Sequence, residues 1–412
     1  MKGRPLWCAR PVPPRKGAWY IKVLTSNTNQ KRELSMKVTV LGETRPGETR
    51  VALIPSTVRE LAKIGCDVTV SSGAGLASHF ADEEYREAGA EVVADAATAV
   101  KGAQIVVKVQ PPTEQEIEYL PKGVVLVSLL SPLTEPQLIG RLGKAGVTAF
   151  ALEMIPRITR AQSMDVLSSQ ATVAGYKAVL LGANALSKFL PMFMTAAGTI
   201  RPGKVLILGA GVAGLQAIAT ARRLGAKVEA FDVRPEVKEQ IESLGASFLE
   251  TEHEVTAEGE GGYAKELSEE QHQRELELIA AHISDTDLVV TTAQIPGRPA
   301  PRLITEEMVD SMRPGSVIVD LAAASGGNCA GAREGETVVR NGVQIIGPAN
   351  LPAGIPVHAS QMFAKNVATF LKELVTDGEL SLDFEDEVVA ATCVTHGGEV
   401  RHGPTKERLG VA

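Results

Sequence analysis

The stretch KVLILGAGVAGLQAIATARRLGAKVEAFD, residues 204–232, decides the fold of this chain. It begins with the apolar run KVLIL, which is typical of a strand buried in a parallel sheet. Gly209, Gly211 and Gly214 follow in the spacing G-x-G-x-x-G, and an alanine-rich segment without proline comes next. A second apolar run ends at Asp232. The order of strand, glycine turn, helix and strand predicts a doubly wound α/β domain.

Each glycine of this turn has a separate physical purpose. Gly209 allows the tight turn, Gly211 lets the backbone approach a pyrophosphate, and Gly214 lets the helix pack close to the strand. The amino terminus of the helix offers free N–H groups and a partial positive charge to phosphates. A glycine cluster alone can be a structural turn in a protein that binds no nucleotide. The flanking strand and helix favour a dinucleotide site here.

The residues after the second strand bear on which dinucleotide is bound. Asp232 lies 23 residues after Gly209, at the tip of that strand. There a carboxylate can accept both hydroxyls of the adenosine ribose and repel a 2′-phosphate. Arg234, two residues further on, could instead pair with such a phosphate. We favour NAD(H) because the acid is at the strand tip itself.

Composition excludes several classes of protein. A chain of 412 residues is too long for one core, while 44% apolar and 22% charged residues are ordinary for a soluble enzyme. A net charge of −7, without a basic patch interleaved with aromatics, argues against nucleic-acid binding. The four cysteines show no metal-ligand spacing, so we predict no metal site and a reduced, cytosolic setting. No apolar run approaches the ~20 residues needed to span a bilayer.

The pattern along the chain predicts two Rossmann-like doubly wound domains with a cleft between them. Residues 1–35 carry eight Lys or Arg and one acid, which predicts a disordered extension or a true start at Met36; a targeting peptide is the alternative. Residues 36–165 alternate strand and helix, which implies parallel order. Residues 166–354 form the predicted NAD(H) domain, and residues 355–412 return to the first domain.

The expected elements follow from runs of apolar residues and their spacing. Strands are expected at residues 37–41, 67–70, 105–109, 124–127 and 148–150, and in the second domain at 204–208, 227–231, 288–291, 317–320 and 343–346. Helices are expected at residues 56–64, 82–88 and 135–144, with a long interdomain helix over 165–190 and a returning helix over 358–375. The tail at 388–400 is expected to form two short strands.

The segment PRITRAQSMDVLSS, residues 156–169, concentrates polar side chains at the expected mouth of the cleft. Such a loop could meet the nicotinamide end of a cofactor with an amide, a carboxylate and a guanidinium. The alternative is a helix amino terminus, with Asp165 as its cap and Arg157 in a surface ion pair. The residues alone leave these two interpretations nearly even.

Three other positions at predicted strand ends could bear on the site. Lys108 could bind a substrate carboxylate or could be a charge that snorkels to the surface. The turns TTAQIPGRPAP, residues 291–301, and DLAAASGGN, residues 320–328, face the same cleft and could lie against the cofactor or be mere turns. In the first turn, Ala293 and Gln294 are included in the predicted site.

The histidines are placed poorly for acid–base chemistry. None of the seven falls at a predicted strand end in the cleft. Oxidation of an alcohol or amino acid needs a proton acceptor near the hydride carbon. Direct hydride exchange between two nicotinamides needs none. The acidic insertion at residues 250–270 is either a lid over the cofactor or a solvated connector.

These motifs resemble those of the NAD(H)-binding component, domain I, of proton-translocating NAD(P) transhydrogenase, in the form where it is a separate α subunit. The similarity runs from Met36 to about His402 and rests on these stretches: RAQSMDVLSSQ, AGYKAV, GAGVAGLQAIATARRLGA, GGYAKE, IPGRPAP, LITEEMV and DLAAASGGN. The resemblance implies a dimer of two-domain subunits, hydride transfer from NADH to NADP⁺ on a partner subunit, and coupling to proton movement by a membrane assembly. It implies a location on the cytoplasmic face of the inner membrane.

The resemblance also implies roles for individual residues. The loop that positions the nicotinamide and its ribose corresponds to Arg157, Gln162, Asp165 and Ser168, with Ser163 and Met164 between them; Gln162, Asp165 and Arg157 are the implied catalytic set. The pyrophosphate turn corresponds to Gly209, Gly211, Val212 and Gly214, and the adenosine contact to Asp232, Val233 and Arg234. Gly262 and Tyr263 correspond to a mobile loop that folds over bound nucleotide.

Alanine dehydrogenase has a similar architecture and is the alternative. GETRPGETRVALIP and Lys108 are shared between the two families. The catalytic His of alanine dehydrogenase is replaced here by Ser131, and its Asp before the paired glycines is replaced by Ala324. Loss of both acid–base groups would disable amino-acid oxidation but not hydride exchange.

Overall fold

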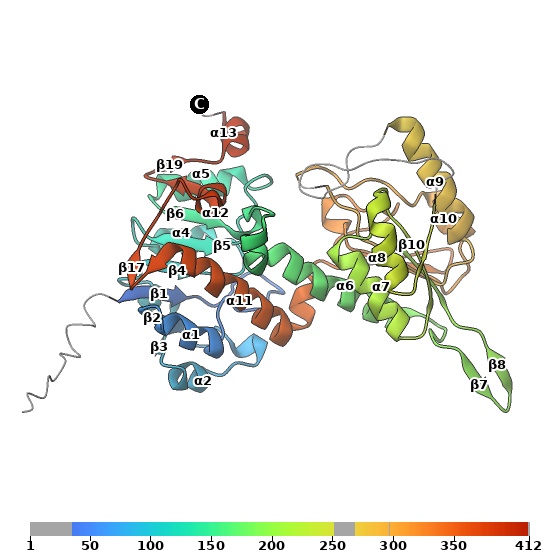
Figure 1. Cartoon of the computed structure of the whole chain (residues 1–412), viewed down its shortest axis with the longest axis horizontal. Coiled ribbons are helices and arrows are strands. Elements are labelled where there is room, and N and C mark those ends of the chain that lie inside the picture. Colours follow the sequence, from blue (N-terminus) through green and yellow to red (C-terminus); the bar gives the residue numbers. More distant parts are fainter. Residues whose placement is uncertain (1–34, 251–267, 296, 411–412) are drawn as a thin grey trace, which may run out of the picture.

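The computed structural model describes residues 35–250, 268–295 and 297–410. They form two large sheets, each with helices on both faces, and two small hairpins; two long helices that lie side by side join the large sheets (Figure 1). These helices are α6 (Val166–Ala185) and α11 (Pro356–Leu374). The expectation of two α/β domains built on parallel sheets is confirmed.

The first sheet has the strand order β19-β18-β6-β5-β4-β1-β2-β3, in which β1 to β6 are parallel. Its strands are β1 (Met36–Val40), β2 (Cys66–Ser71), β3 (Glu91–Val93), β4 (Ile105–Val107), β5 (Val125–Ser128), β6 (Thr148–Ala151), β18 (Cys393–His396) and β19 (Glu399–Val400). Its shorter helices are α1 (Pro55–Ala62), α2 (Asp82–Glu87), α3 (Ala96–Ala99), α4 (Glu114–Tyr119), α5 (Pro136–Lys144), α12 (Glu387–Thr392) and α13 (Gly403–Leu409). The carboxyl-terminal strands β18 and β19 add antiparallel to β6, which ties the end of the chain to this sheet.

The second sheet has the order β11-β10-β9-β12-β13-β15-β14 and is parallel except for β14. Its strands are β9 (Lys204–Leu208), β10 (Lys227–Phe231), β11 (Ser247–Phe248), β12 (Leu288–Thr291), β13 (Val317–Asp320), β14 (Thr337–Arg340) and β15 (Val343–Ile346). The helices around it are α7 (Val212–Arg223), α8 (Lys238–Ser243), α9 (Glu269–Ile283) and α10 (Glu306–Ser311). The quoted stretch therefore forms β9, α7 and β10, and β10 and β9 are the second and third strands of this sheet.

Helix α6 packs closely against the second domain at two glycines, Gly175 against helix α7 and Gly182 against strand β12. A Cβ on Gly175 would lie 2.0 Å from the carbonyl oxygen of Ala213, and one on Gly182 would lie 2.4 Å from Leu288 Cδ1. On its other side, α6 packs against α11, whose Phe363 and Phe370 belong to the core of the first sheet. Together α6 and α11 carry the packing from one sheet to the other.

Every strand expected within the two sheets from the sequence is present, with ends that differ by two residues or fewer. Two expectations were wrong in extent. The long helix ends at Ala185, because Leu186 is extended (φ −66°, ψ 142°) and the chain then leaves toward the hairpin β7 (Phe193–Thr195) and β8 (Gly198–Ile200). In the tail, strands form only from Cys393 onward, since the Asp386 carboxylate accepts the Val388 and Val389 N–H groups and starts helix α12.

The elements that the sequence did not predict are mostly short. They include the β7–β8 and β16–β17 hairpins, the two-residue strand β11 and the antiparallel edge strand β14; β16 spans Val375–Thr376 and β17 spans Glu379–Leu380. Segments of this length carry too few residues to show a periodic pattern. Within the described residues, no helix combines the length and the apolar character that crossing a bilayer requires.

Candidate functional site

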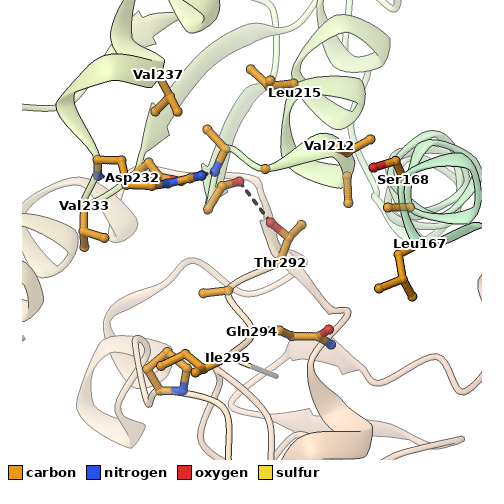
Figure 2. Close-up of a pocket in the computed structure, with 18 of the residues that line it drawn as sticks. Leu167, Ser168, Val212, Leu215, Asp232, Val233, Val237, Thr292, Gln294 and Ile295 are labelled. Atoms are coloured by element: carbon orange, nitrogen blue, oxygen red, sulfur yellow. Dashed lines mark hydrogen bonds and ion pairs between the residues drawn. The ribbon is translucent and has the colours of Figure 1, made fainter. Parts of the chain in front are cut away.

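A cavity of about 1220 Å³ opens where β9, β10 and β12 end and face the amino end of α6. This volume exceeds the ~300–1,000 Å³ of sites for drug-sized ligands, so it can hold a longer molecule. Figure 2 shows Asp232 and Val233 toward one end and Leu167 and Ser168 toward the other, with Val212 and Thr292 between them. We call the first the Asp232 end and the second the Ser168 end.

The glycine turn forms the middle of the cavity wall. Gly209 has a positive φ of 95°, and a Cβ on Gly214 would lie only 1.8 Å from the carbonyl oxygen of Gly209. Around Gly211, by contrast, an added Cβ would meet nothing within 4 Å. Gly209 and Gly214 are thus required by packing within the protein, whereas Gly211 leaves open space next to the start of α7. The backbone N–H groups at that helix end suit a phosphate.

At the Asp232 end, the carboxylate is nearly buried and accepts four hydrogen bonds. Ala210 N donates to Oδ2 at 2.7 Å, and the Arg234 backbone N donates to Oδ1 at 2.9 Å. The Arg234 guanidinium adds Nε to Oδ1 at 2.9 Å and Nη2 to Oδ2 at 2.8 Å. Ribose hydroxyls that bind Asp232 must displace some of these four donors. The Arg234 guanidinium is the donor group that can move away, because the two backbone N–H groups are fixed.

At the Ser168 end, a 3-10 turn, η4 (Thr159–Met164), leads into α6. Asp165 caps this helix: Oδ1 accepts from Ser168 N at 2.9 Å and Oδ2 from Ser168 Oγ at 2.6 Å. Arg157, Gln162, Asp165 and Ser168 all line the cavity. The capping interpretation of Asp165 and its place in the site are therefore compatible, since the same carboxylate does both.

Of the other predicted residues, some line the cavity and some support it. Val212, Val233, Arg234, Ala293 and Gln294 line it, together with Gly209, Gly211 and Asp232. Ser163, Met164 and Gly214 do not; Met164 is buried beneath the turn, and the Ser163 carbonyl accepts a hydrogen bond from Asn366 Nδ2 at 2.8 Å. Gly262 and Tyr263 lie outside the described residues.

The two further turns singled out in the sequence support each other. Asn328, which is fully buried, accepts from Ala293 N at 3.1 Å through Oδ1 and donates to Ala293 O at 2.9 Å through Nδ2. The residue that ends DLAAASGGN thus fixes the backbone of TTAQIPGRPAP at the edge of the cavity.

Lys108 does not snorkel, and that interpretation was wrong. It is 1% exposed, and its Nζ lies 2.7 Å from Glu116 Oε1 and 3.6 Å from Glu43 Oε2. Burial raises the pKa of Glu43 to about 7, although Lys108 works against that rise. Lys108 is not among the residues that line the cavity. Its charge stabilises buried carboxyl groups within the first domain.

Sequence reasoning missed a histidine and an acid in the cavity wall. His272 and Glu275, both on α9, line the cavity, with His272 Nδ1 3.0 Å from Glu275 Oε2. Nothing in their local sequence marks them, because they lie about 40 residues beyond Asp232 on a helix with ordinary amphipathic spacing. Neither Ser131 nor Ala324 lines the cavity, and the described residues contain no group of three His, Cys, Asp or Glu suited to a metal ion.

Comparison with known proteins agrees with this architecture. Residues 39–174 match the family model "Alanine dehydrogenase/PNT, N-terminal domain" and residues 178–403 match "Alanine dehydrogenase/PNT, C-terminal domain". The chain belongs to the alanine dehydrogenase/PNT family, as its motifs indicated.

Within that family the chain lies in the transhydrogenase branch. It is 47% identical to the first part of the NAD(P) transhydrogenase alpha subunit of Rhodospirillum rubrum, over 89% of this chain and 98% of the relative. The crystal structure of a Sinorhizobium meliloti transhydrogenase is 49% identical with a TM-score of 0.81, covering 88% of this chain and 99% of the other. Alanine dehydrogenase of Bacillus subtilis is 31% identical over 91% of this chain and 95% of its own.

Proposed function

We propose that the chain binds NADH in this cavity and presents the reduced nicotinamide to NADP⁺ held by a partner subunit. Both nucleotides are substrates of one reaction. The C4–H bond of NADH breaks with its electron pair and re-forms at C4 of NADP⁺, so NADH is oxidised and NADP⁺ is reduced. No proton is released, and the protein acts mainly through proximity and orientation.

The observation that carries this proposal is the chemistry of the Ser168 end. The side chains there are an exposed guanidinium, an exposed amide and the Asp165 carboxylate, both of whose oxygens are held by Ser168. His272 is the only histidine among the described lining residues, and it is on α9 with Glu275. Among the described residues, the Ser168 end offers only the Asp165 carboxylate as a base, and Ser168 engages both of its oxygens, which suits hydride exchange better than amino-acid oxidation.

The cavity also fits the nucleotide part of NAD(H). The open space at Gly211 and the amino end of α7 suit a pyrophosphate, and the carboxylate of Asp232 suits a ribose diol. We assign the adenosine to the Asp232 end and the nicotinamide to the Ser168 end. The reacting ring is then positioned by Arg157, Gln162 and Asp165. The rest of this part of the cavity wall is formed by Ser168, Ala293 and Gln294.

One assay separates this function from its alternatives. The chain is mixed with NADH, a purified NADP-binding partner domain and an NADP⁺ analogue, and reduction of the analogue is followed by absorbance. Separately, the chain alone receives L-alanine and NAD⁺. We expect reduction only in the first mixture. Turnover of alanine would support an amino-acid dehydrogenase, and NADH binding without any hydride transfer would support a nucleotide-sensing module.

We also propose that the chain works within a larger assembly that couples this reaction to proton translocation. It contains membrane-embedded and NADP-binding subunits, with this chain peripheral on the cytoplasmic face of the inner membrane. Relatives that are named as transhydrogenase subunits support the existence of partner subunits, and the membrane location and proton coupling rest on the family resemblance.

We further propose that the chain forms a homodimer through the β7–β8 hairpin, which projects from the second domain (Figure 1). Its apolar side chains are strongly exposed, with Met194 at 76% and Phe193 at 41%. A monomer seldom exposes apolar residues grouped in this way unless they meet a partner.

Met194→Asp is expected to convert a dimer into a monomer, because a carboxylate would be buried without a partner. Light scattering coupled to gel filtration measures the mass directly. Leu76→Asp, a change at a 59% exposed site in the first domain, is the matched control. A Met194→Asp protein that still elutes as a dimer would exclude the hairpin as the interface.

A further inference from the structure

Helix α9 runs along β10 in the opposite direction and brings a second carboxylate to the Asp232 end. His282 Nδ1 lies 3.0 Å from Glu229 Oε2, which fixes the register of the helix on the strand. From Glu229, three strand residues, about 10 Å, lead to Asp232. From His282, seven helix residues, about 10 Å, lead back to Glu275. Glu275 is therefore level with Asp232.

Packing keeps Glu275 there. Ile279 belongs to the same apolar cluster as Phe231, and Leu276 and Val233 pack against that cluster. Glu275 is 5% exposed, lines the cavity, and is held by His272 at 3.0 Å. Its carboxylate is thus kept inside the wall by its neighbours.

The charges around this end are mostly negative. Besides Asp232 and Glu275, the cavity is lined by Glu236 on the turn after β10 and Glu269 at the start of α9. The basic residues of the described lining are Arg157 at the Ser168 end, Arg234, Arg298 and His272. Burial raises the pKa of Glu275, the bond from His272 opposes that rise, and the charge of Asp232 adds to it. The register of α9 on β10 and the shared cavity wall place the two carboxyl groups close enough for their charges to interact.

We propose that Glu275 is a specificity-determining residue, which together with Asp232 excludes the 2′-phosphate of NADP(H) from this site. The proposal rests on the assignment of the adenosine to the Asp232 end made above. It explains how a site that contains Arg234 can still select NAD(H).

Arg234 by itself would favour the phosphorylated nucleotide, since guanidinium binds phosphate well. Here two of its donors are engaged with Asp232, at 2.9 and 2.8 Å. A 2′-phosphate that drew Arg234 away would leave Asp232 without its counter-charge, with Glu275 close by. Three negative groups would then share one guanidinium in a partly buried site, where like charges repel strongly. A ribose hydroxyl carries no charge and avoids this repulsion.

The test is a comparison of NADH and NADPH affinity by calorimetry on the whole chain. For Glu275→Gln, we expect the ratio of the NADPH Kd to the NADH Kd to fall about tenfold, because one of the repelling charges is removed. Glutamine keeps the shape and can still accept from His272. Should this variant fold poorly, Glu275→Met removes the same charge with similar volume.

Glu277→Gln is the matched control, since this acid is on the same helix but exposed and outside the cavity. Its ratio should equal that of the wild type. If NADH binds and Glu275→Gln leaves the ratio unchanged, Glu275 has no role in specificity, although the proposed function stands. An equal shift in Glu277→Gln would also refute the proposal, because it would show a general charge effect. Absence of NADH binding to the wild type would overturn the proposed function itself.

Discussion

Gly214→Ala will destabilise the second domain by about 3 kcal/mol, the upper part of the range for forcing extra atoms into a packed site. The added Cβ would lie 1.8 Å from the Gly209 carbonyl oxygen and 2.8 Å from its carbon, both backbone atoms of the tight turn. A side chain could rotate away, but a turn with φ of 95° between β9 and α7 cannot. Either the turn or the helix must move.

Calorimetric melting measures this effect. For a domain of this size, the loss corresponds to a melting temperature lower by about 10 °C. NADH binding should weaken as well, because the displaced turn is the one that faces the phosphates. An unchanged melting temperature would show that α7 does not approach β9 as closely as described.

Gly211→Ala is the matched comparison for the same motif. Its backbone is extended (φ −71°, ψ −168°), which alanine adopts freely, and the new Cβ meets nothing within 4 Å. We expect a stability change within about 1 kcal/mol, the size of a helix-cap effect. The NADH Kd should nevertheless rise, since the methyl group occupies the open space assigned to the pyrophosphate. Gly211→Ala would thus weaken NADH binding without the loss of stability expected for Gly214→Ala.

Gln162→Asn is expected to slow hydride transfer about 100-fold, the loss that misplacement by ~1 Å causes when positioning dominates catalysis. Gln162 is exposed on η4 and lines the Ser168 end, so its amide can reach toward a second ring. Asparagine keeps the amide but draws it back by one methylene. The NADH Kd should change far less than the rate, because most of the contacts with the nucleotide are elsewhere.

Single-turnover absorbance with the NADP-binding partner gives this rate, and calorimetry gives the NADH Kd. Gln273→Asn makes the same chemical change at an exposed position of α9 outside the cavity and should leave both quantities unchanged. An unaltered transfer rate in Gln162→Asn would remove Gln162 from its proposed role.

Several features of the site could be predicted because they are local. The tight turn at Gly209, the open space beside Gly211 and the acid at the tip of β10 are all encoded within 29 consecutive residues, 204–232. Apolar runs marked the buried strands for the same reason: a strand's burial depends on its own residue types. Both interpretations of Asp165, as a helix cap and as a cofactor contact, also came from the local sequence around it.

Other features could not be predicted, because they join segments that are distant in the chain. Asn366 on α11 holds the Ser163 carbonyl across 203 positions, and Glu275 reaches the level of Asp232 only through the packing of α9 on β10. Lys108 had an ambiguous position at a strand end until its contact with Glu116 was seen.

The sequence by itself thus determined the doubly wound fold, the glycine turn and the carboxylate at the strand tip, since neighbours along the chain specify these. Only the tertiary structure decided which distant side chains surround that carboxylate and support the turn at Ser163. Those contacts depend on how whole helices pack, and packing is set by the combined surfaces of both partners rather than by either stretch alone.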